Sequence, residues 1–364
     1  MKILHLRSSE FYGSPERLII GQCLHLKEFQ HVCGSFVRPG AESRFLEECE
    51  KAGIYHKAVR ESHLADLRTA ARIGQLIDAE RVDLLVSHDY KANFYGRMAA
   101  KRRSTPQIAY FHGLTSEGLR MRLYNRIDRH VLRKIGLVIT VSEVSKSSLV
   151  ERGVPESRIR VVYNAIDHDS LTKHPKRESS GQPYQRIVAA GRFSHEKGLD
   201  ILLEAIARIK ESAPPFQLYP YGHGVEENNL KQMVSRLGLG DIVEFSGFVD
   251  DILPILADMD FMVMPSRSEG MPVAILEAWS QELGVVATSV GGVPEMIQSG
   301  QNGLLVDPED PGALADRMLW ALNHPEAMRS YGKAGYKTIG EKFTFEIQAA
   351  QLSEIYTEAA GASR

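Results

Sequence analysis

Short apolar runs alternate with helix-length amphipathic stretches from the N-terminus to about residue 306, and this alternation is the strongest constraint on the fold. Strands separated by helical patterns predict βαβ units and parallel sheets rather than a sandwich or a helical bundle. The strands expected in the first half are 2–6, 31–37, 83–87, 107–111, 137–141 and 160–162. Those expected in the second half are 186–190, 217–221, 243–246, 260–264, 285–288 and 303–306.

A stretch without periodicity separates the two series of strands. Residues 167–185 are rich in His, Lys, Ser, Pro and Gly, which is typical of a domain boundary. The 364 residues are too many for one ordinary core and suit two α/β domains. We therefore expect a domain at 1–166, a linker at 167–185 and a domain at 186–343, followed by an amphipathic helix over 344–359 after a break near Gly340. Two such domains imply a cleft.

The composition excludes some classes of function. Hydrophobic residues make up 43% of the chain, charged residues 25%, and the formal net charge is -2, so the basic excess of a nucleic-acid binder is missing. The N-terminus lacks a signal-peptide pattern and no apolar stretch is long enough for a membrane span, so we expect the protein to stay in the cytosol. Cys23, Cys33 and Cys49 lack the paired spacing of zinc sites and are predicted to be reduced packing thiols.

Open parallel sheets bind ligands beyond the carboxyl ends of their strands, so the loops after the strands are the places to search. The loop after strand 186–190 contains Arg192 and Lys197 and leads into an apolar-periodic helix from Leu199. Two cations beside a helix N-terminus suit a pyrophosphate. The alternative is a surface loop with ordinary basic residues. The sequence matches neither a Walker P-loop nor a dinucleotide fingerprint.

The loop after strand 260–264 carries Glu269, Gly270 and Met271 and continues into a helix that Pro272 suits as its first turn. Glu277 lies in that helix among apolar neighbours, so it should be buried and must have hydrogen-bond partners. The vicinal hydroxyls of a ligand would supply those partners, and a local salt bridge to an arginine is the alternative.

Two loops of the first half are further candidates. His112-Gly113 follows strand 107–111, although a lone histidine is more often structural than catalytic. After the first strand, Ser14 can cap a helix that Pro15 opens, and Gly13 would let backbone amides face a phosphate or an acceptor.

Together these features resemble the family-4 retaining glycosyltransferases of the GT-B fold, in which two Rossmann-like domains face each other across a cleft. The resemblance covers nearly the whole chain in order, and the motifs that carry it are His112-Gly113, Gly191-Arg192, Lys197-Gly198, the Glu269-x7-Glu277 spacing, Gly291-Gly292-Val293-Pro294-Glu295 and Asn302-Gly303. The family implies that the final helix, 344–364, returns to the N-terminal acceptor domain and that 186–343 binds the nucleotide-sugar donor.

The resemblance also implies roles for individual residues. Arg192 and Lys197 would contact the donor diphosphate, Glu277 the ribose hydroxyls, and Glu269 with the Gly270 and Met271 amides the donor sugar. His112 would lie near the reacting carbon, Gly13 in the loop that closes on it, and the backbone near Phe248 and Val249 would hold the nucleobase, by default uracil. Ser14 stands where the family often has a second glycine, and Asn164-Ala165 where Asn-Gly is common.

No carboxylate is clearly placed for a covalent intermediate, so we expect same-face displacement, with the leaving phosphate helping to deprotonate the acceptor hydroxyl. Asp258-Met259-Asp260 matches the metal-binding DxD pattern but precedes its strand, at the end away from the expected cleft. We therefore expect no obligatory metal and no resident cofactor, the donor being a substrate.

A basic stretch bears on the acceptor. Residues 117–134 place Arg122, Arg126, Arg129 and Arg133 on one helical face beside an apolar stripe, with Lys101-Arg102-Arg103 nearby. This pattern predicts either docking on an anionic membrane that carries a lipid-linked saccharide acceptor or merely the solvated face of a core helix. The competing functions are a GT-B-fold epimerase or phosphorylase, and a non-catalytic nucleotide-sugar-binding protein.

Overall fold

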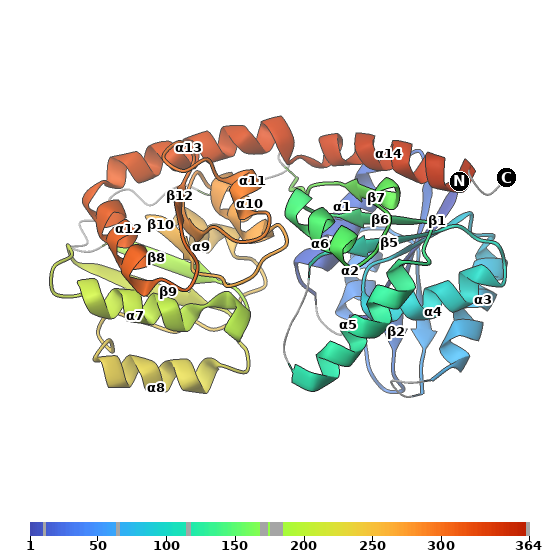
Figure 1. Cartoon of the computed structure of the whole chain (residues 1–364), viewed down its shortest axis with the longest axis horizontal. Helices are drawn as coiled ribbons and strands as arrows, with labels where there is room; N and C mark the ends of the chain where they lie inside the picture. The colour runs from blue at the N-terminus through green and yellow to red at the C-terminus, as the bar shows by residue number, and fades with distance from the viewer. Residues whose placement is uncertain (10–11, 63–65, 114–117, 168–173, 175–184, 362–364) are drawn as a thin grey trace. The chain divides into compact units, whose positions relative to one another are not determined.

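The computed structural model describes residues 1–9, 12–62, 66–113, 118–167, 174 and 185–361, and the side chains of 118–123 lie outside that description. The chain divides into two compact units (Figure 1). Unit 1 comprises Met1–Ala165 and Phe345–Arg364, and unit 2 comprises Ile166–Thr344. Most of the expected linker, 167–185, lies outside the described residues.

Unit 1 is built on a seven-stranded sheet of order β3-β2-β1-β4-β5-β6-β7, in which every neighbouring pair is parallel. Its strands are β1 (Lys2–Arg7), β2 (Gln30–Val37), β3 (His56–Arg60), β4 (Leu84–Ser87), β5 (Gln107–Phe111), β6 (Leu137–Thr140) and β7 (Ile159–Val161). Six of them match expected strands within one or two residues. Sequence reasoning missed β3, because this edge strand exposes most of its side chains and so lacks an apolar run.

The helices of unit 1 cover both faces of this sheet (Figure 1). They are α1 (Ser14–His25), α2 (Arg44–Lys51), α3 (Arg68–Glu80), α4 (Tyr90–Lys101), α5 (Gly118–Leu132), α6 (Glu143–Glu151), the short 3₁₀ turn η1 (Glu156–Arg158) and α14 (Phe345–Gly361). Leu4 and Leu6 of β1 pack with α3 and α4, whereas Cys33 of β2 packs with α1 and α2 on the opposite face. The two faces thus follow the period-2 alternation of the strands.

The last helix is an integral part of unit 1. Phe345, at the start of α14, lies so close to Gly21 of α1 that any side chain at that position would overlap its ring. Gln348 accepts a hydrogen bond from Gln22 Nε2 at 3.1 Å and donates one to the Tyr163 carbonyl at 2.5 Å. Burial of Phe345, Leu352 and Tyr356 therefore fixes the C-terminal helix to the N-terminal sheet.

Unit 2 contains a five-stranded parallel sheet of order β12-β11-β10-β8-β9. Its strands are β8 (Gln185–Ala190), β9 (Phe216–Tyr221), β10 (Phe261–Met264), β11 (Gly284–Thr288) and β12 (Leu304–Val306). The strand expected at 243–246 was wrong: this segment forms only isolated bridges, Leu218 with Val243 and Tyr221 with Gly247. Backbone hydrogen bonds between 242–247 and 218–222 nevertheless keep the segment alongside β9, without the continuous pairing of a strand.

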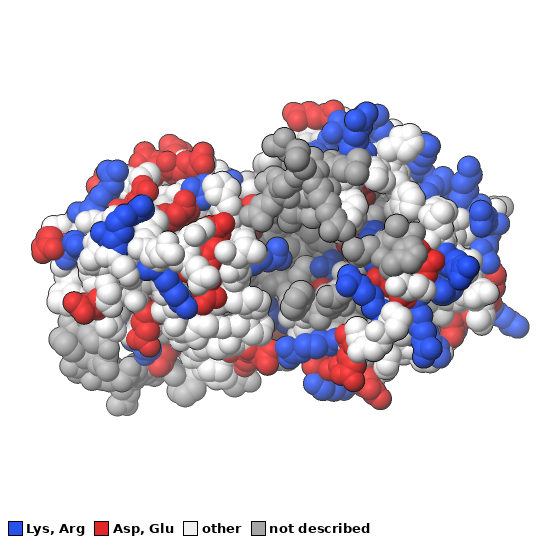
Figure 2. All heavy atoms as spheres, turned by 90° about the horizontal axis from the view of Figure 1, so that it is seen from below, with Lys and Arg blue, Asp and Glu red and all other residues white. Residues whose placement is uncertain are grey.

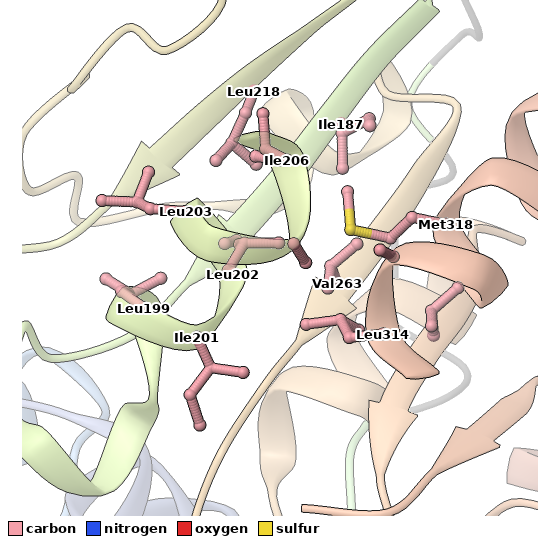
Figure 3. Close-up of a cluster of buried hydrophobic side chains, with 14 of the residues drawn as sticks. Ile187, Leu199, Ile201, Leu202, Leu203, Ile206, Leu218, Val263, Leu314 and Met318 are labelled. Atoms are coloured by element: carbon pink, nitrogen blue, oxygen red, sulfur yellow. The ribbon is translucent and has the colours of Figure 1, made fainter. Parts of the chain in front are cut away.

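The helices of unit 2 are η2 (His195–Lys197), α7 (Leu199–Ile209), α8 (Glu227–Leu237), α9 (Leu253–Ala257), α10 (Val273–Ser280), α11 (Val293–Met296), α12 (Pro311–Asn323) and α13 (Pro325–Lys342). Helix α7 directs Leu202 and Ile206 against Ile187 and Leu218 of the sheet, with Met318 of α12 beside them (Figure 3). Each such side chain stabilises the fold by about 1.5–3 kcal/mol through burial. The helix break expected near Gly340 falls slightly later, at Phe343.

Two features of the surface bear on function. Acidic and basic side chains are interspersed over the face shown in Figure 2, in keeping with the near-zero net charge. Among the described residues, no helix combines the length and the apolar character needed to cross a bilayer.

Candidate functional site

The loop that follows β8 brings a cation to the start of a helix. After Gly191 the chain makes the single turn η2, and α7 begins at Leu199 with Gly198 as its N-cap. Gly198 has a φ of 64°, and any Cβ there would overlap the backbone of Pro265 after β10. The sequence therefore needs glycine at this point, so that the loops after β8 and β10 can touch.

Lys197 and Glu269 meet where these two loops join. Lys197 Nζ lies 2.6 Å from Glu269 Oε1, and the Ser266 hydroxyl donates to the same oxygen at 2.7 Å. Glu269 is almost buried, with 9% of its side chain exposed, whereas Lys197 is 31% exposed. The ion pair thus places an ammonium and a carboxylate beside the N-terminus of α7, at the carboxyl edge of the sheet. Arg192, five residues earlier, is exposed.

An ion pair network that sequence reasoning missed holds this edge together. Arg267 donates to both Asp200 carboxylate oxygens at 2.8 Å and to Glu309 at 3.0 Å. Its backbone N–H donates to the Glu196 carbonyl at 2.7 Å, which ties the loop after β10 to η2. The sequence signal was weak, because Arg267 is a single arginine in a polar loop and its partners lie far away along the chain.

The motif Gly291-Gly292, which follows β11, contacts the same loop. Gly292 N–H donates to the Gly270 carbonyl at 2.7 Å, and Gly291, with a φ of 53°, lies directly against the Glu269 backbone. These glycines therefore pack directly against the backbone of the loop that carries Glu269, Gly270 and Met271. Met271 itself is buried.

The residues of α10 differ slightly from expectation. Pro272 is the N-cap residue rather than the first helical residue, so α10 begins at Val273. Glu277 is buried, as its apolar neighbours predicted, and its backbone carbonyl accepts from the Ser280 hydroxyl at 2.7 Å. A carboxylate in this position requires polar partners.

The expected base-binding segment lies beside the end of β9. Gly222 N–H donates to the Gly247 carbonyl at 2.8 Å, which aligns the chain before Phe248 and Val249 with β9. The Phe248 ring is 53% exposed and stands edge-on to His223, with ring centroids 5.4 Å apart. An exposed aromatic pair at the end of a strand offers a flat surface for a planar ligand.

In unit 1, His112 follows β5 and belongs to a stack of rings. Its ring lies 5.1 Å from that of Tyr110 and 6.2 Å from that of His88, centroid to centroid. Burial, followed by the nearby Arg7 guanidinium, lowers the pKa of His112 to about 3, so the imidazole is neutral near pH 7. Its Nε2 is enclosed and has no hydrogen-bond partner within the described structure. Buried polar atoms are normally hydrogen-bonded, so a bound ligand could supply the missing partner.

The loop after β1 is organised by two residues that the sequence did not single out. Gly13, rather than Ser14, is the N-cap of α1, and its N–H donates to Glu16 Oε2 at 2.9 Å. The buried Glu16 also pairs with Arg7, whose guanidinium donates to the His88 carbonyl at 3.0 Å. The Gly13 amide is therefore already engaged by Glu16, as the N-cap amide is in a capping box.

The acidic pair of the DxD-like pattern is engaged by an arginine. Asp260 accepts from the Arg186 backbone N–H at 2.8 Å, and Asp258 pairs with the Arg186 guanidinium at 3.1 Å. Both acids thus lie at the amino end of β10, opposite to the edge that carries Glu269. The three cysteines are free and buried, as predicted.

Two family models match the chain. The model described as glycosyltransferase family 4 matches residues 22–170, and the one described as glycosyl transferases group 1 matches residues 184–324. An uncharacterized glycosyltransferase of Methanocaldococcus jannaschii is 28% identical over 297 residues, which are 80% of each chain.

A putative colanic acid biosynthesis glycosyltransferase of Escherichia coli K12 is 28% identical over 267 residues, 70% of this chain and 64% of that relative. The match therefore spans a little under two thirds of that relative's length. Among solved structures, Anabaena HepE in complex with UDP and glucose superimposes with a TM-score of 0.86 at 23% identity, covering 98% of this chain and 99% of that one.

Proposed function

Since the chain belongs to the group 1 glycosyltransferases of the GT-B fold, we propose that it moves a sugar from a nucleotide-diphosphate sugar, with UDP as the carrier, to a hydroxyl of a saccharide acceptor and retains the anomeric configuration. The acceptor class that we favour is a lipid-linked precursor of lipopolysaccharide or another polysaccharide. Similarity to glycosyltransferases named for colanic acid and lipopolysaccharide core biosynthesis supports this choice, and the UDP in the HepE structure supports the carrier.

One observation carries the proposal: Lys197 Nζ lies 2.6 Å from Glu269 Oε1 at the N-terminus of α7. An ammonium at this point, beside the positive end of the α7 dipole, can bind a diphosphate, and Arg192 adds a second cation. The adjoining carboxylate accepts hydrogen bonds and so suits sugar hydroxyls. When a donor binds, its phosphate competes with Glu269 for Lys197, and its sugar hydroxyls can occupy the freed carboxylate oxygen.

The other residues take the roles that the family resemblance gives them. The buried Glu277 binds the ribose hydroxyls, the Gly270 and Met271 amides bind the donor sugar, and Phe248 with Val249 borders the base. The neutral His112 imidazole, with its unpartnered Nε2, makes a hydrogen bond to the sugar near the reacting carbon. Gly13 keeps the family's place in the acceptor loop, now supported by Glu16.

In the transfer step, the bond from the anomeric carbon to the diphosphate oxygen breaks while the acceptor oxygen bonds to the same face. The acceptor proton passes to the departing phosphate oxygen. Arg192, Lys197 and the α7 dipole stabilise the negative charge that develops on that leaving group. We propose that no metal is needed for this step, and the engagement of Asp258 and Asp260 by Arg186 supports this. Full activity in EDTA would agree with the proposal. Loss of activity in EDTA that Mg²⁺ or Mn²⁺ restores, with Tm unchanged throughout, would contradict it.

The first experiment is a thermal-shift and hydrolysis screen with UDP-, GDP- and ADP-sugars, using the native protein and Glu277→Ala. We expect one donor to raise Tm and the variant to lose that shift, because the ribose contact is gone. Slow hydrolysis of the donor, accelerated by an acceptor hydroxyl, identifies a transferase. Binding without any turnover would instead favour the nucleotide-sugar-binding protein, and conversion of the donor without an acceptor would favour an epimerase.

The cations are tested with matched controls. Arg192→Ala and Lys197→Ala should each lower kcat by about a hundredfold or more, since each removes stabilisation of the leaving group. Arg236→Ala removes a similarly exposed arginine at the end of α8, and Lys231→Ala removes a lysine that is ion-paired to Glu227 at 2.7 Å. Both controls should turn over normally. Near-normal kcat in either site variant would overturn the assignment.

For the membrane contact, we propose that α5 docks on anionic lipid. Arg126 and Arg129 are exposed, and Ile127 is 39% exposed between them, whereas Val131 is buried in the core. The Arg122 side chain lies outside the described residues, Arg133 donates to the Arg152 carbonyl at 2.7 Å, and Arg103 pairs with Asp78. Arg126 and Arg129 therefore carry the proposal.

Liposome flotation tests this contact. The protein should float with vesicles that contain anionic phospholipid but not with neutral ones, and the double variant Arg126→Glu/Arg129→Glu should remain at the bottom of the gradient. Flotation that is indifferent to lipid charge would refute the proposal.

A further inference from the structure

A cluster of metal-ligating side chains lies in the interior of unit 1, outside the residues assigned to glycosyl transfer. His5, Cys23 and His31 each offer one ligand atom, and the three atoms lie within 4.8 Å of one another. His5 is completely buried and Cys23 is buried at 7% exposure. We infer that these three residues bind a zinc ion.

The sheet register brings the three residues together. In the parallel pairing of β1 with β2, His5 lies opposite Cys33, and His31 lies opposite Ile3. Because side chains alternate between faces, His5, His31 and Cys33 all point to the side that α1 covers. Cys23 reaches the cluster from α1, which packs on this side of the sheet. The ligands thus come from three elements.

The distances fit a tetrahedral ion. With Zn–N near 2.05 Å and Zn–S near 2.3 Å, two nitrogen ligands lie about 3.3 Å apart and two sulfur ligands about 3.8 Å apart. His5 Nε2 and His31 Nδ1 are 3.1 Å apart, and the sulfurs of Cys23 and Cys33 are 3.9 Å apart. The two nitrogens need only small shifts to admit the ion. Cys33 Sγ, although it lies near Cys23, is not among the ligand atoms that lie within 4.8 Å of one another, so it is not counted as a ligand.

The hydrogen bonds around the cluster already have the form of an outer ligand shell. The Leu26 carbonyl can only accept, so His31 Nε2 at 2.9 Å must be the protonated nitrogen and Nδ1 carries the lone pair. Metal-binding histidines are usually oriented in this way by a backbone carbonyl on the other ring nitrogen. His5 Nδ1 lies 3.2 Å from His88 Nε2, which supplies the equivalent partner on the second ligand.

Without an ion, His5 Nε2–H donates to His31 Nδ1. Zinc replaces that hydrogen bond: Cys23 loses its thiol proton to solvent, and the proton of His5 moves to Nδ1, from which it is donated to His88 Nε2. The proton of His88 then resides on its Nδ1. Each imidazole keeps one proton, so binding releases one proton in all.

The ligand set indicates which ion binds. Two imidazoles with a thiolate suit zinc, whereas magnesium and calcium require oxygen ligands. A site enclosed between β1, β2 and α1 has a structural role, linking the first helix to the sheet. It is independent of the proposal that glycosyl transfer itself needs no metal.

The native full-length chain is tested first, by elemental analysis after purification without added metal and by cobalt substitution during expression. We expect about one equivalent of zinc per chain, and for the cobalt form the visible bands of a tetrahedral site with a thiolate-to-cobalt charge-transfer band. These two measurements do not depend on any variant being folded. Less than about 0.1 equivalent of zinc and no tetrahedral cobalt spectrum would overturn the inference.

Variants then assign the ligands. Cys23→Ser and His31→Asn should lower the zinc content at least fivefold and abolish the charge-transfer band or shift its position. Cys49→Ser changes another buried thiol near α1 and β2. His56→Asn changes a histidine of β3 whose Nδ1 lies 3.1 Å from the Ile54 carbonyl. Both should keep the metal. Zinc content unchanged in the first pair, or lost equally in the second, would refute these ligands.

Discussion

Gly291→Ala should disable the candidate donor site without removing any of its side chains. Gly291 has a φ of 53°, and a Cβ there would approach the Glu269 carbonyl oxygen about 1 Å closer than real Cβ atoms approach other atoms. Because Gly292 N–H also holds the Gly270 carbonyl at 2.7 Å, the loop cannot recede without breaking that hydrogen bond. The loop that carries Glu269 must therefore move by about 1 Å, and a displacement of this size costs about a hundredfold in rate when the loop positions a substrate.

The same substitution adds backbone strain, and a second glycine separates the two effects. A left-handed alanine costs about 1–2 kcal/mol of stability wherever it occurs. Gly300 has a φ of 82° but nothing lies within 4 Å of its Cβ position, so Gly300→Ala adds the strain without the overlap. Both variants should lose stability in urea unfolding, and Gly291→Ala should lose more.

The decisive assays are donor binding by calorimetry and kcat/KM with the donor found by the screen. We expect about a hundredfold loss of kcat/KM for Gly291→Ala and less than threefold for Gly300→Ala. If Gly291→Ala is folded and its kcat/KM stays within threefold of the native value, Glu269 is not part of the donor site or its loop is not held as described.

Three further predictions concern unit 1. Burial raises the pKa of Asp128 to about 6, so the folded state favours the protonated carboxyl, and folding stability falls as the pH rises from about 4 through 6. Asp128→Asn cannot ionise, so it should stabilise the fold by about 1–3 kcal/mol at pH 7 but not at pH 4. Equal urea midpoints for the two proteins at pH 7 would contradict this. His112, with its pKa near 3, should add no limb to the pH profile of kcat/KM between pH 5 and 8; a limb near 6.5 that disappears in His112→Asn would show the opposite. Glu16→Ala should destabilise the chain by about 3 kcal/mol, because it leaves the Arg7 guanidinium and the Gly13 N–H without their buried partner, and circular dichroism in urea should reveal a loss of at least 1 kcal/mol.

The local chemistry of the donor loops could be predicted from the sequence. The strand at 186–190 and the apolar periodicity from Leu199 correctly placed Lys197 beside a helix start. The apolar neighbours of Glu277 correctly predicted its burial. These predictions succeeded because each rests on residues within one turn or one strand, where spacing along the chain fixes spacing in three dimensions.

Predictions failed where an element has a weak hydrophobic pattern or where contacts with other residues determine its local structure. The edge strand β3 has no apolar run, and the segment 243–246 alternates apolar and polar residues as a strand would but forms only isolated bridges. Ser14 was expected to cap α1, yet Glu16 supplies the cap and lets Gly13 take that position.

The sequence by itself determined the succession of strands and helices, the loops that bear the chemistry, and the family to which the chain belongs. Only the tertiary structure decided which residues meet. It places Lys197 against Glu269, Gly291 against the Glu269 backbone, and His5 and His31 of the sheet beside Cys23 of α1. The reason is physical, since periodicity records which face of an element is buried, whereas strand order and register determine which buried faces meet.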